Sequence, residues 1–266
     1  MTETTTAAPV QTNYSPAATG RKIMVQIQRQ DDASSAPYWE KFEIPYRPNM
    51  NVISVLMEIQ AYPTNAEGKE VAPVAWDCNC LEEVCGACSM NINGTPRQAC
   101  SALVDNLDQP LVLEPFKKFP VVRDLVVDRQ SMFENLKRIH GWIPIDGSYD
   151  LGPGPRMAEE VREKMYKLSE CMTCGCCLEA CPQVNDHSDF IGPASISQVR
   201  LFNNHPTGSM HASERLDALM GDGGLHACGN AQNCVRVCPK EIPLTDSIAD
   251  MGRAVTVHAI KKFLKH

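Results

Sequence analysis

The sequence contains no run of about 18 or more apolar residues, the length that a membrane-spanning helix requires. It also lacks an apolar centre in residues 1–20, which are rich in Thr, Ala and Pro, so no secretory signal is expected. The formal net charge of −7 disfavours nucleic acid as a partner, which would require a basic surface. Neither a glycine-rich phosphate-binding motif nor a nucleophile–base constellation is found, so we expect no catalytic residue in this chain.

Cysteine, by contrast, is abundant, with 13 residues among 266. The odd number argues against a complete disulfide framework. Without a secretory signal, it predicts a reducing compartment in which thiols are free to bind metal.

Hydrophobic patterns divide the chain into three parts. Residues 1–20 are predicted to be a disordered leader, residues 21–127 a domain of strands with one helix, and residues 128–266 a helical domain. Glycine and proline at 152–155 predict a break within the last part. The helical periodicity there predicts helices at 157–170, 195–202, 212–220 and 245–264.

Two local signals are informative in the first domain. Asn51 is a suitable N-cap for a helix that ends near Tyr62, with Ile53, Leu56 and Met57 predicted on one face. The Asn-Gly pair at 93–94 predicts a type I′ hairpin between two strands.

The first cysteine run has the C-x4-C-x2-C…C spacing of plant-type [2Fe–2S] ferredoxins, which have a β-grasp fold. Its members are Cys80, Cys85, Cys88 and Cys100. Such a cluster needs four converging thiolates, and Gly86 allows backbone N–H groups to approach the sulfurs. The alternative, a zinc site on Cys85 and Cys88, needs a second C-x2-C pair that this run does not supply.

The other two runs follow the C-x2-C-x2-C-x3-C-P template of bacterial ferredoxins. The second run consists of Cys171, Cys174, Cys177 and Cys181. The third run has an alanine, Ala231, at one thiolate position and otherwise consists of Cys228, Cys234 and Cys238. In two-cluster ferredoxins, the fourth cysteine of each run binds the other cluster.

Exchange of the fourth cysteines predicts one complete and one incomplete ligand set. The complete set would hold a [4Fe–4S] cluster and consists of Cys171, Cys174, Cys177 and Cys238. The incomplete set consists of Cys181, Cys228 and Cys234. Because a cubane without a ligand at one corner readily loses that iron, the incomplete set predicts a [3Fe–4S] cluster. A [4Fe–4S] cluster with water or hydroxide at the open corner is the alternative.

Two cysteines remain outside these sets. Cys78 fits no ligand template, and Cys176 lies beside Cys177 within a ligand loop. Both are predicted to be buried, unreactive thiols.

This arrangement resembles the iron–sulfur subunits of succinate dehydrogenase and fumarate reductase. The resemblance covers nearly the whole chain after residue 20 and includes the segments 119–128 and 190–194. Segment 80–90 is most similar to Bacillus-type, menaquinone-linked succinate dehydrogenases. The fold class implied is α+β, with an N-terminal β-grasp [2Fe–2S] ferredoxin domain and a C-terminal α-helical, bacterial-ferredoxin-like domain.

The resemblance implies an electron-transfer subunit of a succinate:quinone oxidoreductase. Electrons would pass from a FAD-bearing flavoprotein subunit through [2Fe–2S], [4Fe–4S] and [3Fe–4S] to quinone, with menaquinone favoured. A membrane anchor subunit with haem b would hold the chain at the cytoplasmic face of the cell membrane. The alternatives are the reverse role in a quinol:fumarate reductase, a relay subunit of an unrelated soluble dehydrogenase, and a zinc-stabilised structural protein.

The residues expected near the quinone differ from those of ubiquinone-reducing relatives. Those carry a Trp pair after the Cys-Pro of the second run, where this chain has Gln183 after Pro182. They also often carry His at the position of Gly229. Candidate quinone-side residues are Pro182, Gln183 and His226, although His226 is alternatively a surface or capping histidine.

Two charged sites complete the predictions. Arg123 and Asp124 are interpreted as an ion pair that fixes the orientation of the domains. Lys240 either raises the potential of a nearby cluster through its charge or is an ordinary solvated lysine.

Overall fold

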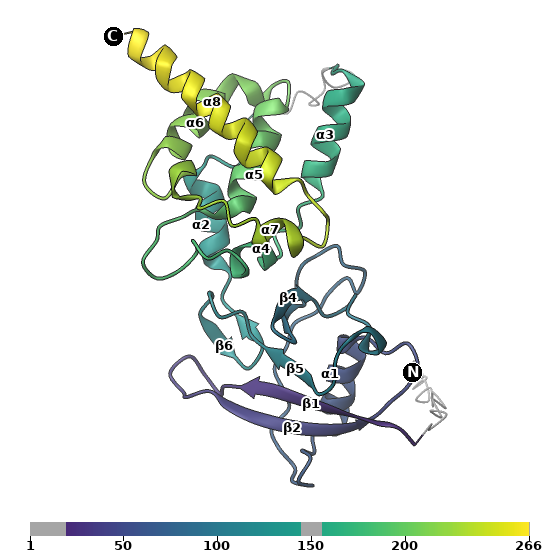
Figure 1. Ribbon diagram of the computed structural model, residues 1–266. Helices are drawn as coiled ribbons and strands as arrows, with labels where there is room; N and C mark the ends of the chain where they lie inside the picture. The colour runs from purple at the N-terminus through teal and green to yellow at the C-terminus, as the bar shows by residue number, and fades with distance from the viewer. Residues whose placement is uncertain (1–19, 145–155, 266) are drawn as a thin grey trace, which may run out of the picture.

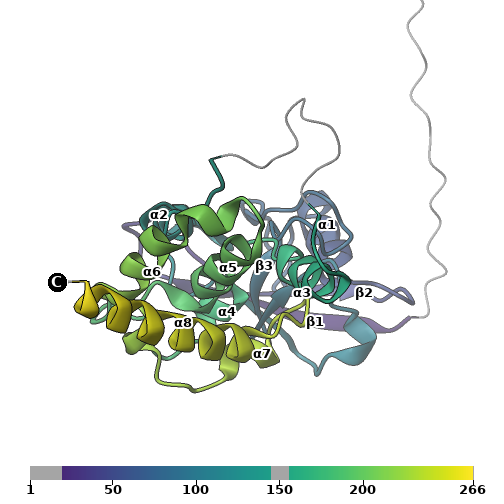
Figure 2. The ribbon, with the colours of Figure 1, turned by 90° about the horizontal axis from the view of Figure 1, so that it is seen from above.

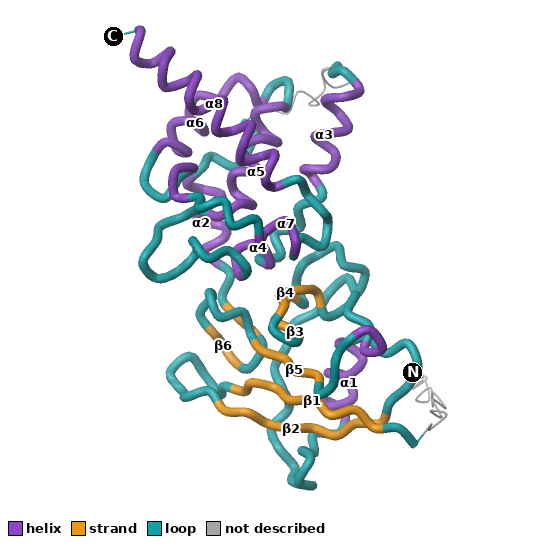
Figure 3. The backbone as a smooth tube through the Cα atoms, in the orientation of Figure 1, coloured by secondary structure: helices purple, strands orange, loops and turns teal. Residues whose placement is uncertain are grey.

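The computed structural model describes residues 20–144 and 156–265, which form a strand-rich lower part and a helical upper part (Figure 1). Figure 3 shows that strands are confined to the lower part, where helix α1 lies beside them. The predicted leader, apart from Gly20, and the predicted break at 152–155 lie outside the described residues. Within the described ranges, no helix is both long and apolar enough to cross a membrane.

A five-stranded mixed sheet with the order β2-β1-β5-β3-β4 forms the first domain. Its elements are β1 (Lys22–Arg29), β2 (Tyr38–Pro45), α1 (Val52–Ala61), β3 (Ser89–Ile92), β4 (Thr95–Gln98) and β5 (Leu111–Glu114). The interior strand β1 alternates, with Ile23, Val25 and Ile27 buried, because successive side chains point to opposite faces of a strand. It pairs with β2 in antiparallel and with β5 in parallel orientation.

Helix α1 packs its apolar face into the core of this sheet. Asn51 is the N-cap as predicted, and its Oδ1 accepts a hydrogen bond of 2.9 Å from the backbone N–H of Ser54. Ile53 and Leu56 are buried, but the prediction for Met57 was wrong, since its side chain is 57% exposed. The helix buries Val52 and Val55 instead, so its buried face is rotated away from Met57.

The hairpin between β3 and β4 turns at Asn93 and Gly94, which both have positive φ, 49° and 75°. A type I′ turn needs positive φ at both central positions, so the predicted turn is confirmed.

The helical domain consists mainly of five longer helices. They are α2 (Gln130–Arg138), α3 (Glu159–Ser169), α5 (Gly192–Asn204), α6 (Ala212–Met220) and α8 (Leu244–Leu264). Short helical turns lie within or directly before the cysteine runs, namely α4 (Cys176–Glu179), η3 (Leu225–Ala227) and α7 (Asn233–Arg236). Seen from above, α8 runs along one side of α5 and α6 (Figure 2), with which it makes contacts.

A connecting segment with the small hairpin β6 (Val121–Arg123) and β7 (Val126–Val127) joins the two parts. Its Phe116 and Phe119 pack in one core with Met132 and Leu168 of the helical domain. Glu179 of α4 accepts backbone N–H bonds from Lys117 and Lys118, so the connection is fixed to the helical domain by polar as well as apolar contacts.

The predicted ion pair of Arg123 and Asp124 is present, but it is not the closest contact of Asp124. Its carboxylate lies 3.9 Å from Arg123 but accepts a 2.8 Å bond from Arg29 Nε, and both side chains of the second pair are fully buried. Backbone N–H groups of Gln30 and Ala75 complete its bonds. The pair therefore joins the connecting segment to the first domain rather than orienting one domain against the other.

Candidate metal centres

The first cysteine run winds around the sulfur of Cys80. Three backbone N–H groups donate to Cys80 Sγ, from Glu82 at 3.4 Å and from Val84 and Cys85 at 3.3 Å each. These bonds lower the pKa of Cys80 to about 7. The loop thus stabilises negative charge on a sulfur before any metal is bound, as a cluster ligand requires.

The remaining cysteines of this run meet Cys80 at the end of the β3–β4 hairpin. Cys88 and Cys100 are buried, and Cys100 interacts electrostatically with both Cys88 and Cys80. Cys100 follows β4, which ends at Gln98. Burial and the neighbouring Cys88 raise the pKa of Cys100 to about 12, so iron binding here must displace a proton.

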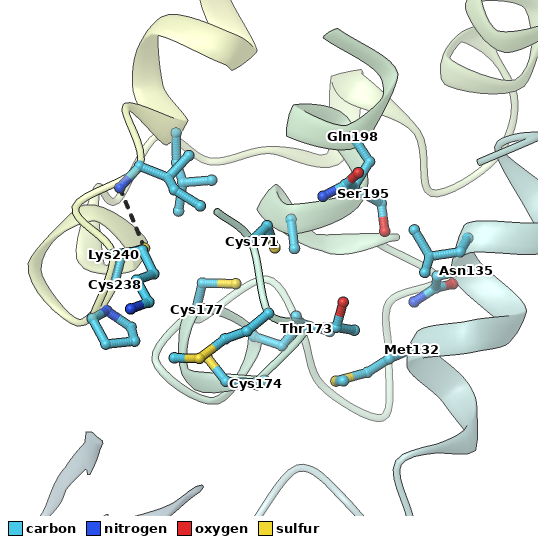
Figure 4. Close-up of a pocket in the computed structure, with 18 residues that line it drawn as sticks. Met132, Asn135, Cys171, Thr173, Cys174, Cys177, Ser195, Gln198, Cys238 and Lys240 are labelled. Atoms are coloured by element: carbon cyan, nitrogen blue, oxygen red, sulfur yellow. Dashed lines mark hydrogen bonds between the residues drawn. The ribbon is translucent and has the colours of Figure 1, made fainter. Parts of the chain in front are cut away.

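The second candidate centre is a cavity between α2, α4, α5 and the start of α8, called the second cavity below. It is lined by four cysteines from the second and third runs (Figure 4). They are Cys171, Cys174, Cys177 and Cys238. The structure therefore brings Cys238 to the first three cysteines of the second run, across more than sixty residues of sequence. Much of the remaining lining is apolar, including Met132 and Leu178.

Burial and hydrogen bonding shift the pKa values of these thiols in opposite directions. Burial raises the pKa of Cys171 and of Cys177. A hydrogen bond from the Cys176 side chain, in contrast, lowers the pKa of Cys174 to about 7, with a smaller contribution from the charge of Arg129. Cys238 Sγ accepts a 3.4 Å bond from the backbone N–H of Ile242. Donors aimed at sulfur in an otherwise apolar cavity fit a multi-thiolate cluster.

A third cavity is lined by Cys181, Cys228 and Cys234, with Ala231 at the position where the template has a cysteine. Its lining thus contains three thiols, and a methyl group stands where the template would place a fourth. Asn233 Nδ2 donates to the carbonyl of Ala180 at 3.0 Å and so connects the third run to the end of the second.

The candidate quinone-side residues are placed differently from one another. Pro182 and Gln183 line the third cavity, whereas His226 lies on the turn η3, outside the lining residues. A Cβ added to Gly229 would lie 2.6 Å from Gln183 Nε2. The glutamine therefore occupies space that a side chain at position 229 would need.

Of the other sequence candidates, Lys240 lines the second cavity beside Cys238 (Figure 4). Cys176 is fully buried as predicted, but the prediction for Cys78 was wrong, because Cys78 is exposed. Cys78 lies in the irregular loop that leads to Cys80.

Sequence reasoning missed the contact between the first and second cysteine loops. Gly86 has φ of +73°, and a Cβ there would lie 2.9 Å from both Cα and Cβ of Cys174. Arg129 donates to the carbonyls of Gly86 at 2.6 Å and Ala87 at 3.0 Å and holds the first loop against the helical domain. In the sequence, the only local sign of this close approach is Gly86 itself, which lies between Cys85 and Cys88.

In the described part of the chain, no three Cys, His, Asp or Glu side chains converge as ligands of a single metal ion would. The thiolates of a cluster are distributed over several iron atoms, with two thiolates per iron in [2Fe–2S] and one per iron in a cubane, so they need not converge on one point.

Two domain families match the chain in the order of its two domains. Residues 24–134 match the 2Fe-2S iron-sulfur cluster binding domain, and residues 167–242 match the 4Fe-4S dicluster domain. The predicted fold class, a [2Fe–2S] ferredoxin domain followed by a helical bacterial-ferredoxin-like domain, is thereby confirmed.

Relatives cover nearly the whole chain. The succinate dehydrogenase iron–sulfur subunit of Bacillus subtilis is 65% identical over 91% of this chain and 96% of its own. The fumarate reductase iron–sulfur subunit of Wolinella succinogenes is 29% identical over 88% of this chain and 97% of its own. A chain in the solved structure of the Mycobacterium smegmatis Sdh1 complex in the apo form superposes with a TM-score of 0.73 at 26% identity, covering 88% of this chain and 95% of that one. The chain therefore belongs to the family of succinate dehydrogenase iron–sulfur subunits, the electron-transfer subunits of that enzyme.

Proposed function

We propose that this subunit carries three clusters and passes electrons from a FAD-bearing flavoprotein subunit to menaquinone. The proposed ligands of [2Fe–2S] are Cys80, Cys85, Cys88 and Cys100. Those of [4Fe–4S] are Cys171, Cys174, Cys177 and Cys238, and those of [3Fe–4S] are Cys181, Cys228 and Cys234. When bound, the clusters supply one-electron carriers, and the chain supplies thiolates, N–H donors to sulfur, and apolar walls that exclude water.

One observation carries this assignment: the exchange of cysteines between the second and third runs. Cys238 shares a cavity with Cys171, Cys174 and Cys177, while Cys181 shares one with Cys228 and Cys234. Ala231 lines the third cavity, which holds Cys181, Cys228 and Cys234, and offers no ligand atom. A cluster at that site would have three protein thiolates, which favours [3Fe–4S].

We infer that the partners are the flavoprotein subunit and a membrane anchor subunit with haem b, which holds the chain at the cytoplasmic face of the membrane. The similarity to a chain of the Sdh1 complex and to the Bacillus subtilis subunit supports assembly into a larger enzyme. Pro182 and Gln183 are the proposed quinone-side residues, since they line the third cavity, and His226 is a more distant candidate.

The same chain could serve the reverse reaction, quinol:fumarate reduction, because fumarate reductase subunits are also relatives at 29% identity. The identity of 65% to a succinate dehydrogenase subunit favours succinate oxidation. A soluble relay role predicts a different outcome on purification, since the chain would then not co-purify with a flavoprotein and a haem-bearing anchor.

Low-temperature EPR of the purified complex tests the cluster assignment. The oxidised protein should show the signal of a [3Fe–4S] cluster, and stepwise reduction should reveal one [2Fe–2S] and one [4Fe–4S] signal. Two [4Fe–4S] signals without a three-iron signal would contradict the role of Ala231. Replacement of Cys238 should abolish the [4Fe–4S] signal, whereas loss of the three-iron signal alone in that variant would contradict the exchange of ligands.

A further inference from the structure

The end of helix α8 exposes large apolar side chains. The exposed fraction is 45% for Val257, 55% for Ile260, 81% for Phe263 and 76% for Leu264. At about 100° per residue, these side chains fall within one sector of about 120° of the helix surface. They therefore form one continuous apolar surface, called the α8 face below, and not a set of scattered exposed residues, which would need no explanation.

Basic side chains occupy the neighbouring sector of the same helix. His258 Nε2 and Lys262 Nζ each lie 2.9 Å from Asp217 Oδ1 of α6, so this sector turns toward α6. Together with Lys261 and Lys265, they line a groove between α6 and α8. The α8 face accordingly turns away from α6 and is bordered by cations along one side.

The charge of this segment is opposite in sign to that of the whole chain. Residues 251–265 contain no Asp or Glu, whereas the chain has a formal net charge of −7. The cations of the segment are Arg253, Lys261, Lys262 and Lys265. Lysines at a helix C-terminus also suit the helix dipole, but the dipole does not account for the exposed apolar side chains beside them. An apolar sector bordered by cations is typical of a helix that lies on an anionic membrane surface.

The position of α8 in the fold agrees with such a surface. Thr245 and Ile248, at the start of α8, line the third cavity, where the proposed quinone-side residues lie. Quinone is dissolved in the bilayer, so a site that serves it must be close to the membrane. From this cavity the helix runs to the end of the helical domain that lies away from the first domain (Figure 1).

We propose that the α8 face binds anionic phospholipid directly, with Phe263 and Leu264 among the acyl chains and Lys261 and Lys265 at the headgroup phosphates. In the described part of the chain, neither of these lysines has a carboxylate partner, so both are available to phosphate. The long stems of lysine let the ammonium groups reach headgroups while the helix lies at the acyl boundary. A protein surface would instead have to supply carboxylates or bury the charges. The acidic remainder of the chain is repelled by an anionic surface, which orients the end of α8 toward it.

Co-sedimentation of the purified full chain with lipid vesicles tests this site. Vesicles of equal parts phosphatidylglycerol and phosphatidylcholine should bind the chain about tenfold or more tightly than vesicles of phosphatidylcholine alone, and added salt should weaken the binding. The double variant Phe263→Ser/Leu264→Ser should bind about tenfold or more weakly, since it loses the transfer of two apolar side chains out of water. The double variant Lys261→Gln/Lys265→Gln should lose most of the preference for phosphatidylglycerol.

The chain offers a matched control for each double variant. Phe133→Ser removes an apolar side chain that is 60% exposed on α2, away from the α8 face. Lys41→Gln/Lys69→Gln removes two positive charges from exposed positions of the first domain. Both controls should bind vesicles like the wild type, because neither changes the α8 face or the cations beside it.

The outcomes distinguish lipid from protein as the occupant. Equal binding of the two vesicle types by the wild type, or unchanged binding by Phe263→Ser/Leu264→Ser, would refute the lipid site. If the wild type binds no vesicle and this variant fails to co-purify with the anchor subunit, the α8 face is a protein contact and the proposal is wrong.

The proposal rests on the proposed membrane location but not on the cluster ligand sets, and EPR of the same samples separates the two. A chain that binds no vesicle but shows all three cluster signals would refute the lipid site and leave the proposed electron path standing. Lipid binding without a three-iron signal would support the lipid site and contradict the cluster assignment alone.

Discussion

Replacement of Gly86 by alanine should weaken the contact between the first two cysteine loops. The backbone at Gly86 has φ of +73°, a left-handed conformation that costs an L-residue about 1–2 kcal/mol. The new Cβ would lie 2.9 Å from Cα and Cβ of Cys174 and 3.1 Å from the carbonyl oxygen of Met172. Because these neighbours are mainly backbone atoms, the loops must move apart rather than rearrange a side chain.

The size of this effect follows from the two contributions. Ordinary contact begins at 3.4 Å, so the loops must separate by about 0.5 Å, the difference between 3.4 and 2.9 Å. Overpacking of this kind costs about 1–3 kcal/mol, which with the backbone term gives roughly 2–5 kcal/mol of lost stability. At about 2–4 °C per kcal/mol, the unfolding temperature should fall by roughly 4–20 °C.

Gly94→Ala is the matched control for this variant. Gly94 has nearly the same φ, +75°, but nothing lies within 4 Å of its added Cβ. It therefore carries the backbone cost without the clash. Calorimetry of both variants in the assembled complex, with EPR to confirm all three clusters, isolates the contact with Cys174. Equal unfolding temperatures for the two variants would refute the reasoning, since the clash would then cost nothing.

Three further variants test other parts of the structure. Ala231→Cys should convert the three-iron site towards [4Fe–4S], and an unchanged three-iron EPR signal would count against the proposed ligand set. Asp124→Ala removes the fully buried partner of Arg29 but leaves its 2.6 Å ion pair with Glu40, so it should cost about 1.5–3 kcal/mol in the free energy of unfolding, the range for a hydrogen bond to a charged group. A loss below about 1 kcal/mol would contradict this estimate. Lys240→Gln removes a positive charge from the lining of the second cavity and should lower the [4Fe–4S] midpoint in a redox titration, with the [2Fe–2S] midpoint as the internal reference.

The local patterns of the sequence determined much of the fold. Ligand spacing within one loop, an Asn-Gly turn and an Asn cap each depend on neighbouring residues, and the turn and the cap appear in the structure where they were predicted. Even the association of Cys238 with the second run was predictable, because the repeated template carries the exchange of its fourth cysteine.

Contacts between distant segments were decided only by the tertiary structure. Asp124 was assigned to Arg123 because the two are adjacent, but its buried partner is Arg29, 95 residues away. Likewise, the glycine at position 86 signals a close approach, but the sequence does not indicate that its neighbour is Cys174, or that Gln98 lies between Cys88 and Cys176. Spacing encodes which cysteines share a loop, whereas the packing of two domains decides which loops and side chains meet, because that packing depends on many weak contacts that no local pattern records.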